Sequence, residues 1–247
     1  LRANGDAVER AVLIGTEGTG DSQKLPVAVD AAVAMVGRLL AQDPRWAGQP
    51  AFPVLVDSAL RMVDRAPVAF TVQMPDAHGG RVPVSGHAGK FLLQYLLAKS
   101  LSGPAEFGNL PRLMAELAQG DPGNLLRITQ RRLEATDFNA LGYLLDGAAG
   151  ASDARVALIR EQAATALLSD AANFPVPEIA RTLGAARLPE RYRADVASAT
   201  PALFVTGEYD GNTPPAQAER IRAGFPKSAH LIVKNAGHAD PMRSPAV

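Results

Sequence analysis

The stretch that decides the fold is residues 200–238, which reads TPALFVTGEYDGNTPPAQAERIRAGFPKSAHLIVKNAGH. Residues 201–206 form a short apolar run, typical of a strand buried on both faces. Residues 207–215 are rich in turn formers, and a helix is predicted after them, with Thr213 as its N-cap and Gly224 and Pro226 at its end. A second strand is predicted at residues 230–234, followed by a glycine turn. The pattern is therefore strand, acidic turn, helix, strand and turn.

Two polar residues follow the predicted strands, Asp210 after the first and His238 after the second. The carboxyl ends of adjacent parallel strands open onto one crevice, so we expect these side chains to meet there. A carboxylate in that place can accept the Nδ1 proton of the histidine and leave Nε2 free as a base. Asp210 and His238 are therefore the candidate catalytic residues. Taken singly, they could also be a turn aspartate and a surface-loop histidine.

The segments GEYDGNTPP and NAGH resemble the C-terminal end of the α/β-hydrolases, in particular the proline iminopeptidase and tripeptidyl aminopeptidase-like serine peptidases. This resemblance implies a serine peptidase with a Ser-His-Asp triad, in which His238 takes the proton of the serine and Asp210 holds His238. The implied activity is an aminopeptidase that releases residues or short peptides from peptide N-termini. Esterases of the same fold share this ending, so an esterase is the alternative.

The N-terminal residues continue the resemblance, since residues 8–14 predict a strand that corresponds to the sixth strand of the family. We therefore expect the chain to be the C-terminal portion of a hydrolase, with the nucleophile elbow before Leu1. The elbow needs small residues around its serine, as in G-x-S-x-G, and Ser85 lacks the glycine two positions earlier. The chain alone is expected to be inactive and to need the missing N-terminal hydrolase segment, in the same or a second chain.

Residues 26–194 are predicted to be mostly helical and to interrupt the hydrolase core, which we assign to residues 1–25 and 195–247. In the resembling family an insertion at this place forms a cap over the active site. The expected fold is thus α/β: three parallel strands with flanking helices and a large, mainly helical cap. The alternative is a non-catalytic helical binding module. Helices are predicted at 26–40, 52–63, 86–102, 106–118, 124–134, 138–146 and 153–173, and a hairpin pairs 68–74 with 81–84.

The composition limits the partners. Lys and Arg number 25, as do Asp and Glu, without a basic cluster, which argues against a nucleic-acid surface. No apolar run approaches the roughly 20 residues that span a bilayer, so no membrane partner is expected. Cysteine is absent, and His78 and His87 have no third ligand indicated, so no metal or organic cofactor is implied. The compartment is left open.

Glu17 is a candidate substrate-binding residue, because it stands just past the predicted strand 8–14. The aminopeptidases that this chain resembles recognise the free amine of the substrate through acidic residues near the cap. A carboxylate pairs well with an ammonium group in a partly desolvated pocket. Glu17 could equally be an ordinary loop carboxylate. The expected ligand is a peptide or a small ester or amide.

Overall fold

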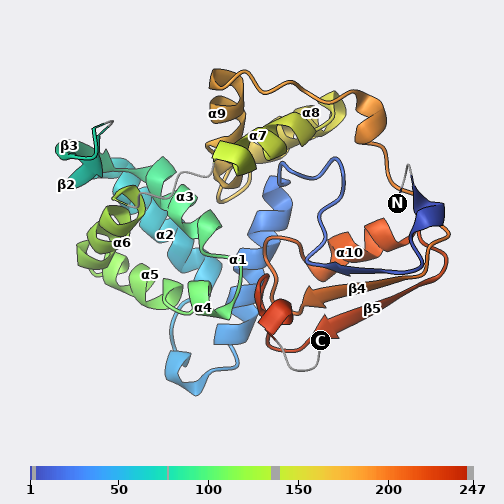
Figure 1. The fold of residues 1–247 in the computed structure, drawn as a ribbon. Coiled ribbons are helices and arrows are strands. Elements are labelled where there is room, and N and C mark those ends of the chain that lie inside the picture. The colour runs from blue at the N-terminus through green and yellow to red at the C-terminus, as the bar shows by residue number, and fades with distance from the viewer. Residues whose placement is uncertain (2–3, 77, 135–139, 244–247) are drawn as a thin grey trace.

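The computed structural model describes residues 1, 4–76, 78–134 and 140–243. It has a mixed α/β fold in two parts (Figure 1). A small parallel sheet and helix α10 lie on one side, and a group of helices lies on the other, with the long helix α1 between them. Helices α7, α8 and α9 form a separate layer above α1 in this view.

The sheet consists of β1 (Ala11–Ile14), β4 (Ala202–Gly207) and β5 (Ser228–Val233), in the order β1-β4-β5. All pairs are parallel, with Ile14 opposite Val205 and Thr206 opposite Ile232. The three parallel strands expected from the sequence are therefore confirmed. The central strand β4 is largely buried, as its continuous apolar run predicts, and Phe204 is fully enclosed.

Helix α10 (Pro215–Arg222) covers one face of this sheet. Residues two apart on β4 point to the same face, so Ala202 and Phe204 both meet the helix side. There they pack with Ala218 of α10 and with Phe225, whose ring lies edge-on to Phe204 at 5.4 Å between centroids. The sheet thus has a small core of its own.

The segment between β1 and β4 has a second, larger core. The helices between residues 26 and 133 place apolar residues three or four positions apart, as Val29, Val33 and Val36 of α1 do, and these faces meet in one cluster. The helices are α1 (Pro26–Leu40), α2 (Phe52–Arg65), α3 (Lys90–Lys99), α4 (Pro104–Phe107), α5 (Leu110–Ala118), α6 (Gly123–Leu133), α7 (Ala140–Ala149), α8 (Asp153–Ala163) and α9 (Val176–Thr182). Short 3-10 turns lie at Gly5–Ala7, Pro44–Trp46, Ala171–Asn173, Glu190–Tyr192 and Asp240–Arg243.

The predicted hairpin is present as β2 (Val68–Pro75) and β3 (Arg81–Ala88), which pair antiparallel along their whole length. Asp76 closes its turn, because its side chain accepts hydrogen bonds from the main-chain N–H groups of His78 and Gly80, both at 2.8 Å. Strand β3 is longer than predicted. Its last residues, 86–88, were predicted to open the following helix, which instead begins at Lys90.

Two other predicted helices are shorter in the structure. The helix predicted at 106–118 breaks into α4 and α5 at Gly108, and Pro111 occupies the first turn of α5, where its missing N–H costs nothing. The helix predicted at 153–173 ends at Ala163. Beyond that point the carboxylate of Asp30 accepts the N–H groups of Leu167 and Leu168 at 2.8 and 3.2 Å, which replaces helical hydrogen bonding.

The N-terminal predictions also need correction. Strand β1 begins at Ala11 rather than at residue 8, and a 3-10 turn (Gly5–Ala7) precedes it. Residues 138 and 139, the start of the helix predicted at 138–146, lie outside the described residues. Helix α9 was not predicted, although Pro177 in its first turn is a typical start signal.

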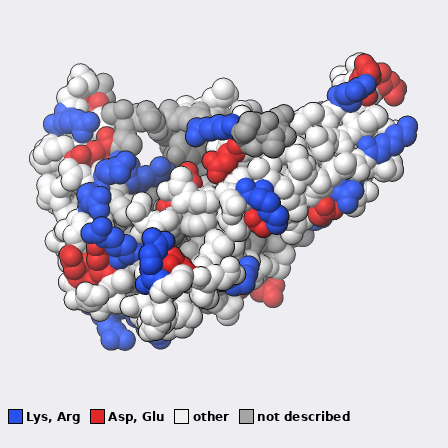
Figure 2. Space-filling model, turned by 90° about the horizontal axis from the view of Figure 1, so that it is seen from below, with Lys and Arg blue, Asp and Glu red and all other residues white. Residues whose placement is uncertain are grey.

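Acidic and basic side chains are interspersed over the face of the molecule seen in Figure 2. This distribution agrees with the equal numbers of acidic and basic residues in the sequence. Within the described part of the chain, every helix is too short or too polar to cross a membrane.

Candidate active site

The turn after β4 is built around the carboxylate of Asp210, which is completely buried. Its Oδ1 atom accepts the main-chain N–H groups of Asn212 and Thr213, both at 2.8 Å. Its Oδ2 atom accepts the Thr213 hydroxyl at 2.8 Å and the Nδ1–H of His238 at 2.9 Å. Four hydrogen bonds use the full acceptor capacity of a carboxylate, so Asp210 is held in one orientation.

Thr213 does not cap α10, in contrast to the prediction. The N-cap residue is Pro214, and no side chain caps the helix there. The buried Thr213 hydroxyl instead donates to Asp210, and its oxygen lies 3.0 Å from Nδ1 of His238. Thr213 therefore ties the carboxylate and the imidazole together.

His238 stands in the loop after β5, with about a third of its side chain exposed (34%). Its main-chain N–H donates to the carbonyl of Ser102 at 2.7 Å, which fixes the loop against the helical segment. Since Nδ1 donates to Asp210, Nε2 of the neutral ring carries the free lone pair. The side-chain amide nitrogen of Asn212 lies 3.2 Å from that atom.

The hydrogen bond to Asp210 raises the pKa of His238 above its ordinary value. Burial of the ring acts in the opposite direction, and the charge of Asp210 adds to the increase. The charges of Lys24 and Glu17 also reach the ring, the first lowering the pKa and the second raising it. The imidazole is thus coupled to a carboxylate and lies within electrostatic range of the pocket described below.

Glycines allow the strand ends to crowd around this pair. Gly15, directly after β1, has φ +55°, and a Cβ there would lie 3.0 Å from Cε1 of His238. A Cβ on Gly237 would collide with the backbone of Ser102 and Gly103. The ends of all three sheet strands and the loop after α3 therefore converge on one imidazole.

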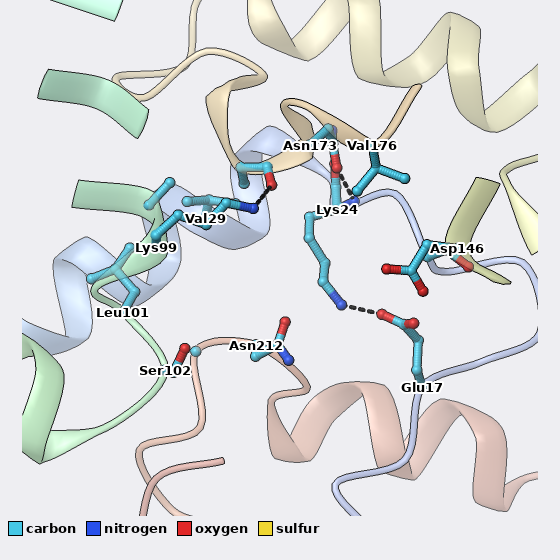
Figure 3. Close-up of a pocket in the computed structure, with 14 residues that line it drawn as sticks. Glu17, Lys24, Val29, Lys99, Leu101, Ser102, Asp146, Asn173, Val176 and Asn212 are labelled. Atoms are coloured by element: carbon cyan, nitrogen blue, oxygen red, sulfur yellow. Dashed lines mark hydrogen bonds and ion pairs between the residues drawn. The ribbon is translucent and has the colours of Figure 1, made fainter. Parts of the chain in front are cut away.

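A cavity of about 410 Å³ opens beside Asn212. Four charged side chains line it: Glu17, Lys24, Lys99 and Asp146 (Figure 3). Glu17 follows β1, as predicted, and forms an ion pair with Lys24. The main chain of Lys24 exchanges hydrogen bonds with the side chain of Asn173, which holds the residue at the pocket wall.

The structure brings Asp210 and His238 into direct contact and places Glu17 in the neighbouring cavity. Sequence reasoning missed two polar residues that contact the Asp210–His238 pair and three of the charged residues that line the cavity. Asn212 and Thr213 could have been found, because an aspartate followed by turn formers often accepts the next main-chain N–H groups. The other three come from distant segments and have no local signal: Lys24, Lys99 and Asp146.

The α/β-hydrolase family model described as "TAP-like protein" matches residues 180–247. That range contains β4, α10 and β5 and both residues of the Asp210–His238 pair. The match supports an α/β-hydrolase. The C-terminal part of the chain therefore indicates a hydrolase-type enzyme, in agreement with the parallel sheet. No curated protein matches the chain.

Proposed function

We propose that this chain supplies the histidine and the aspartate of a Ser-His-Asp triad in a serine aminopeptidase. The observation that carries the proposal is the 2.9 Å contact between Nδ1 of His238 and the buried carboxylate of Asp210. That contact fixes the tautomer whose Nε2 can take a proton from a serine hydroxyl and return it to the leaving amine. Asp210 stabilises the imidazolium that forms in between.

The serine itself is proposed to belong to an N-terminal hydrolase segment, in the same or a second chain, because no G-x-S-x-G occurs in the 247 residues. Among the described strands β1 has one neighbour, β4, so its other edge can accept a further parallel strand. A strand added there would extend the sheet on the side of Gly15, where a Cβ would lie 3.0 Å from Cε1 of His238. The nucleophile would then approach Nε2 by displacing the amide of Asn212.

Residues 26–194 are proposed to form the cap, and residues 1–25 and 195–247 the partial hydrolase core. The support is that the helical segment helps to enclose the cavity. Lys99 of α3, Asp146 of α7 and Asn173 line the cavity, and the carbonyl of Ser102 accepts the main-chain N–H of His238. A cap that encloses the site excludes water and strengthens the electrostatic interactions inside it.

Glu17 is proposed to recognise the free ammonium group of the substrate. Its carboxylate lines the cavity beside Asn212, and only a third of its side chain is exposed. The ammonium group of Lys24 is paired with the Glu17 carboxylate, so the amine of a substrate would compete with Lys24 for Glu17. The family model's description as TAP-like agrees with an aminopeptidase, whereas an esterase would have no use for this carboxylate.

The first test is labelling of the purified natural protein with a fluorophosphonate, followed by intact mass measurement. We expect one adduct on a serine, in the same or an associated chain. His238→Ala should slow labelling by about 10³-fold, because the serine loses its base. His78→Ala, in the exposed hairpin turn, is the matched control. Absence of an adduct would contradict the hydrolase and favour a helical binding module.

The second test separates the aminopeptidase from the esterase. Alanine p-nitroanilide, its N-acetyl derivative and N-acetylalanine p-nitrophenyl ester are compared as substrates. Glu17→Gln should raise KM for the free amine about tenfold and leave the acetylated substrates unchanged. Glu9→Gln, on the exposed surface, is the control. Turnover of the acetylated ester without turnover of either p-nitroanilide would establish the esterase instead.

A further inference from the structure

The cavity beside Asn212 contains two charged groups that are not paired with each other. Glu17 and Lys24 form an ion pair, but Lys99 and Asp146 form none within the described residues. Nζ of Lys99 donates to the main-chain carbonyl of Ala172 at 2.8 Å, which is a neutral acceptor. In Figure 3, Glu17 and Asp146 lie on one side of the cavity and Lys99 on the other, with Lys24 reaching down between them. The cavity thus offers one cation and one anion at separate places.

Lys99 stands in surroundings that disfavour its charge. Its pKa is lowered to about 8, mainly by burial and also by the charges of Arg132 and Lys24, whereas the charge of Asp146 acts to raise it. The ring of Tyr95 lies 5.7 Å from Nζ. A partly desolvated ammonium without a carboxylate partner is costly, and an anion bound beside it would remove that cost. The side chain is therefore suited to bind a carboxylate.

We propose that this cavity binds a zwitterion, namely a short peptide with both ends free. The peptide's carboxylate pairs with Lys99, and its ammonium group lies against Asp146 and Glu17. This proposal rests on the proposed aminopeptidase and names its substrate class. It adds recognition of the far, carboxyl-terminal end, which limits the length of the peptide.

The size and position of the cavity agree with such a ligand. A volume of about 410 Å³ is within the range of small-molecule sites. Each residue of an extended peptide adds roughly 3.5 Å between its charged ends, so two fixed ends select one or two lengths. Asn212 lines the cavity and contacts Nε2 of His238, so a peptide held by both ends would run past the imidazole.

The test is calorimetric titration of the purified natural protein with L-alanyl-L-alanine, its C-terminal amide and its N-acetyl derivative, together with trialanine and tetraalanine. We expect the amide and the N-acetyl form to bind about tenfold more weakly than the free dipeptide. Affinity should also fall at tetraalanine. Equal affinities for the acid and the amide, or no heat with any peptide, would overturn the proposal. These arms need no variant, so they do not depend on a mutant folding.

Variants assign the two ends. Lys99→Met should abolish the difference between the acid and the amide and keep the effect of N-acetylation, while Asp146→Asn should do the reverse. Lys90→Met, at the other end of α3 and exposed, is the matched control. If Lys99→Met still prefers the acid as strongly as the parent, Lys99 is not the carboxylate site.

A pH series adds a second readout. N-acetyl-alanyl-alanine has no amine, so its affinity should fall tenfold per pH unit above about 8, as Lys99 loses its proton. Arg132 of α6, Lys24 and Asp146 of α7 are the charged groups that act on Lys99. A flat profile would contradict the proposal. Fluorophosphonate labelling reports separately on catalysis. If the serine is labelled but the peptide acid and its amide bind equally well, only the zwitterion site is rejected. If the acid binds more tightly than the amide but no serine is labelled, only the hydrolase is rejected.

Discussion

Residue by residue, the centre of the site is a histidine whose protonation is controlled by one carboxylate. The hydrogen bond to Asp210 raises the pKa of His238 above 6.5. NMR titration should therefore show a pKa above 6.5 for His238. Asp210→Asn should lower this pKa, because burial of the ring is then no longer opposed by the hydrogen bond to a charged carboxylate. Glu9→Gln should leave this titration as in the parent. An Asp210→Asn variant with the parent's His238 pKa would contradict the assigned cause.

The same coupling links the stability of the fold to pH. A raised pKa means that the folded state binds the proton more tightly than the unfolded chain. The stabilisation from His238 is therefore fully present below pH 6.5 and is lost as the pH rises through the folded-state pKa. In urea unfolding, the difference in free energy between the parent and His238→Gln should shrink over that pH interval. A difference that grows with pH would show that the pKa is lowered instead.

Thr213 contacts both the Asp210 carboxylate and the His238 imidazole and holds the two together. Thr213→Val keeps the shape but removes the hydroxyl that donates to Asp210, and it leaves a buried carboxylate with one acceptor site unfilled. We expect Thr213→Val to lower the free energy of unfolding by about 1–3 kcal/mol, whereas Thr213→Ser keeps the hydroxyl and should retain most of the parent's stability. Denaturant unfolding of the two variants measures the difference. Equal losses in both would mean that the methyl group, not the hydroxyl, matters.

At the level of elements, local signals decided which predictions succeeded. The helix at residues 26–40 was predicted with its observed bounds, because Pro26 opens it and its valines recur at helical spacing. The hairpin was found because two alternating runs flank a turn. The helix predicted at 153–173 was too long, because the side chain that ends its hydrogen bonding, Asp30, lies far away in the sequence.

The loop that carries His238 depends on a close contact between two backbones. A Cβ at Gly237 would lie 2.7 Å from the carbonyl oxygen of Ser102 and would also overlap Gly103. Since neither is a flexible side chain, Gly237→Ala should lower the free energy of unfolding by about 1–3 kcal/mol and shift the His238 titration. Gly89→Ala is the control, because a Cβ there has only ordinary contacts, the nearest at 3.8 Å. If the two variants have the same free energy of unfolding, the loop with Gly237 can move away from the loop with Ser102 and Gly103 at no cost.

For the whole molecule, the topology explains which site residues could be predicted. Asp210 and His238 follow adjacent parallel strands, so the order of elements along the chain was enough to bring them together. Lys99 and Asp146 lie on helices α3 and α7, and no sequence pattern fixes how those helices pack over the sheet. The pair at the strand ends was therefore predictable, whereas the cavity residues that come from the helices required the three-dimensional structure.

The sheet also exposes apolar side chains beside an open edge. Val12 of β1 is 58% exposed, and Leu231 and Ile232 of β5 are 39% and 42% exposed. In the described part of the chain β1 pairs with β4 alone, so its other edge presents unpaired main-chain groups. Such an edge promotes association, and we expect the 247-residue chain by itself to self-associate.

Val12→Lys should increase the monomer fraction of this chain in sedimentation velocity, because a charge on an edge strand opposes strand pairing. Val27→Lys is the matched control, since Val27 is also exposed (51%) but lies on α1. A parent chain that is monodisperse and unfolds cooperatively would show that the edge is already protected. Equal effects of the two lysines would show that net charge, and not the edge of β1, governs association. A selective effect of Val12→Lys would instead locate the surface where a further strand is proposed to join the sheet.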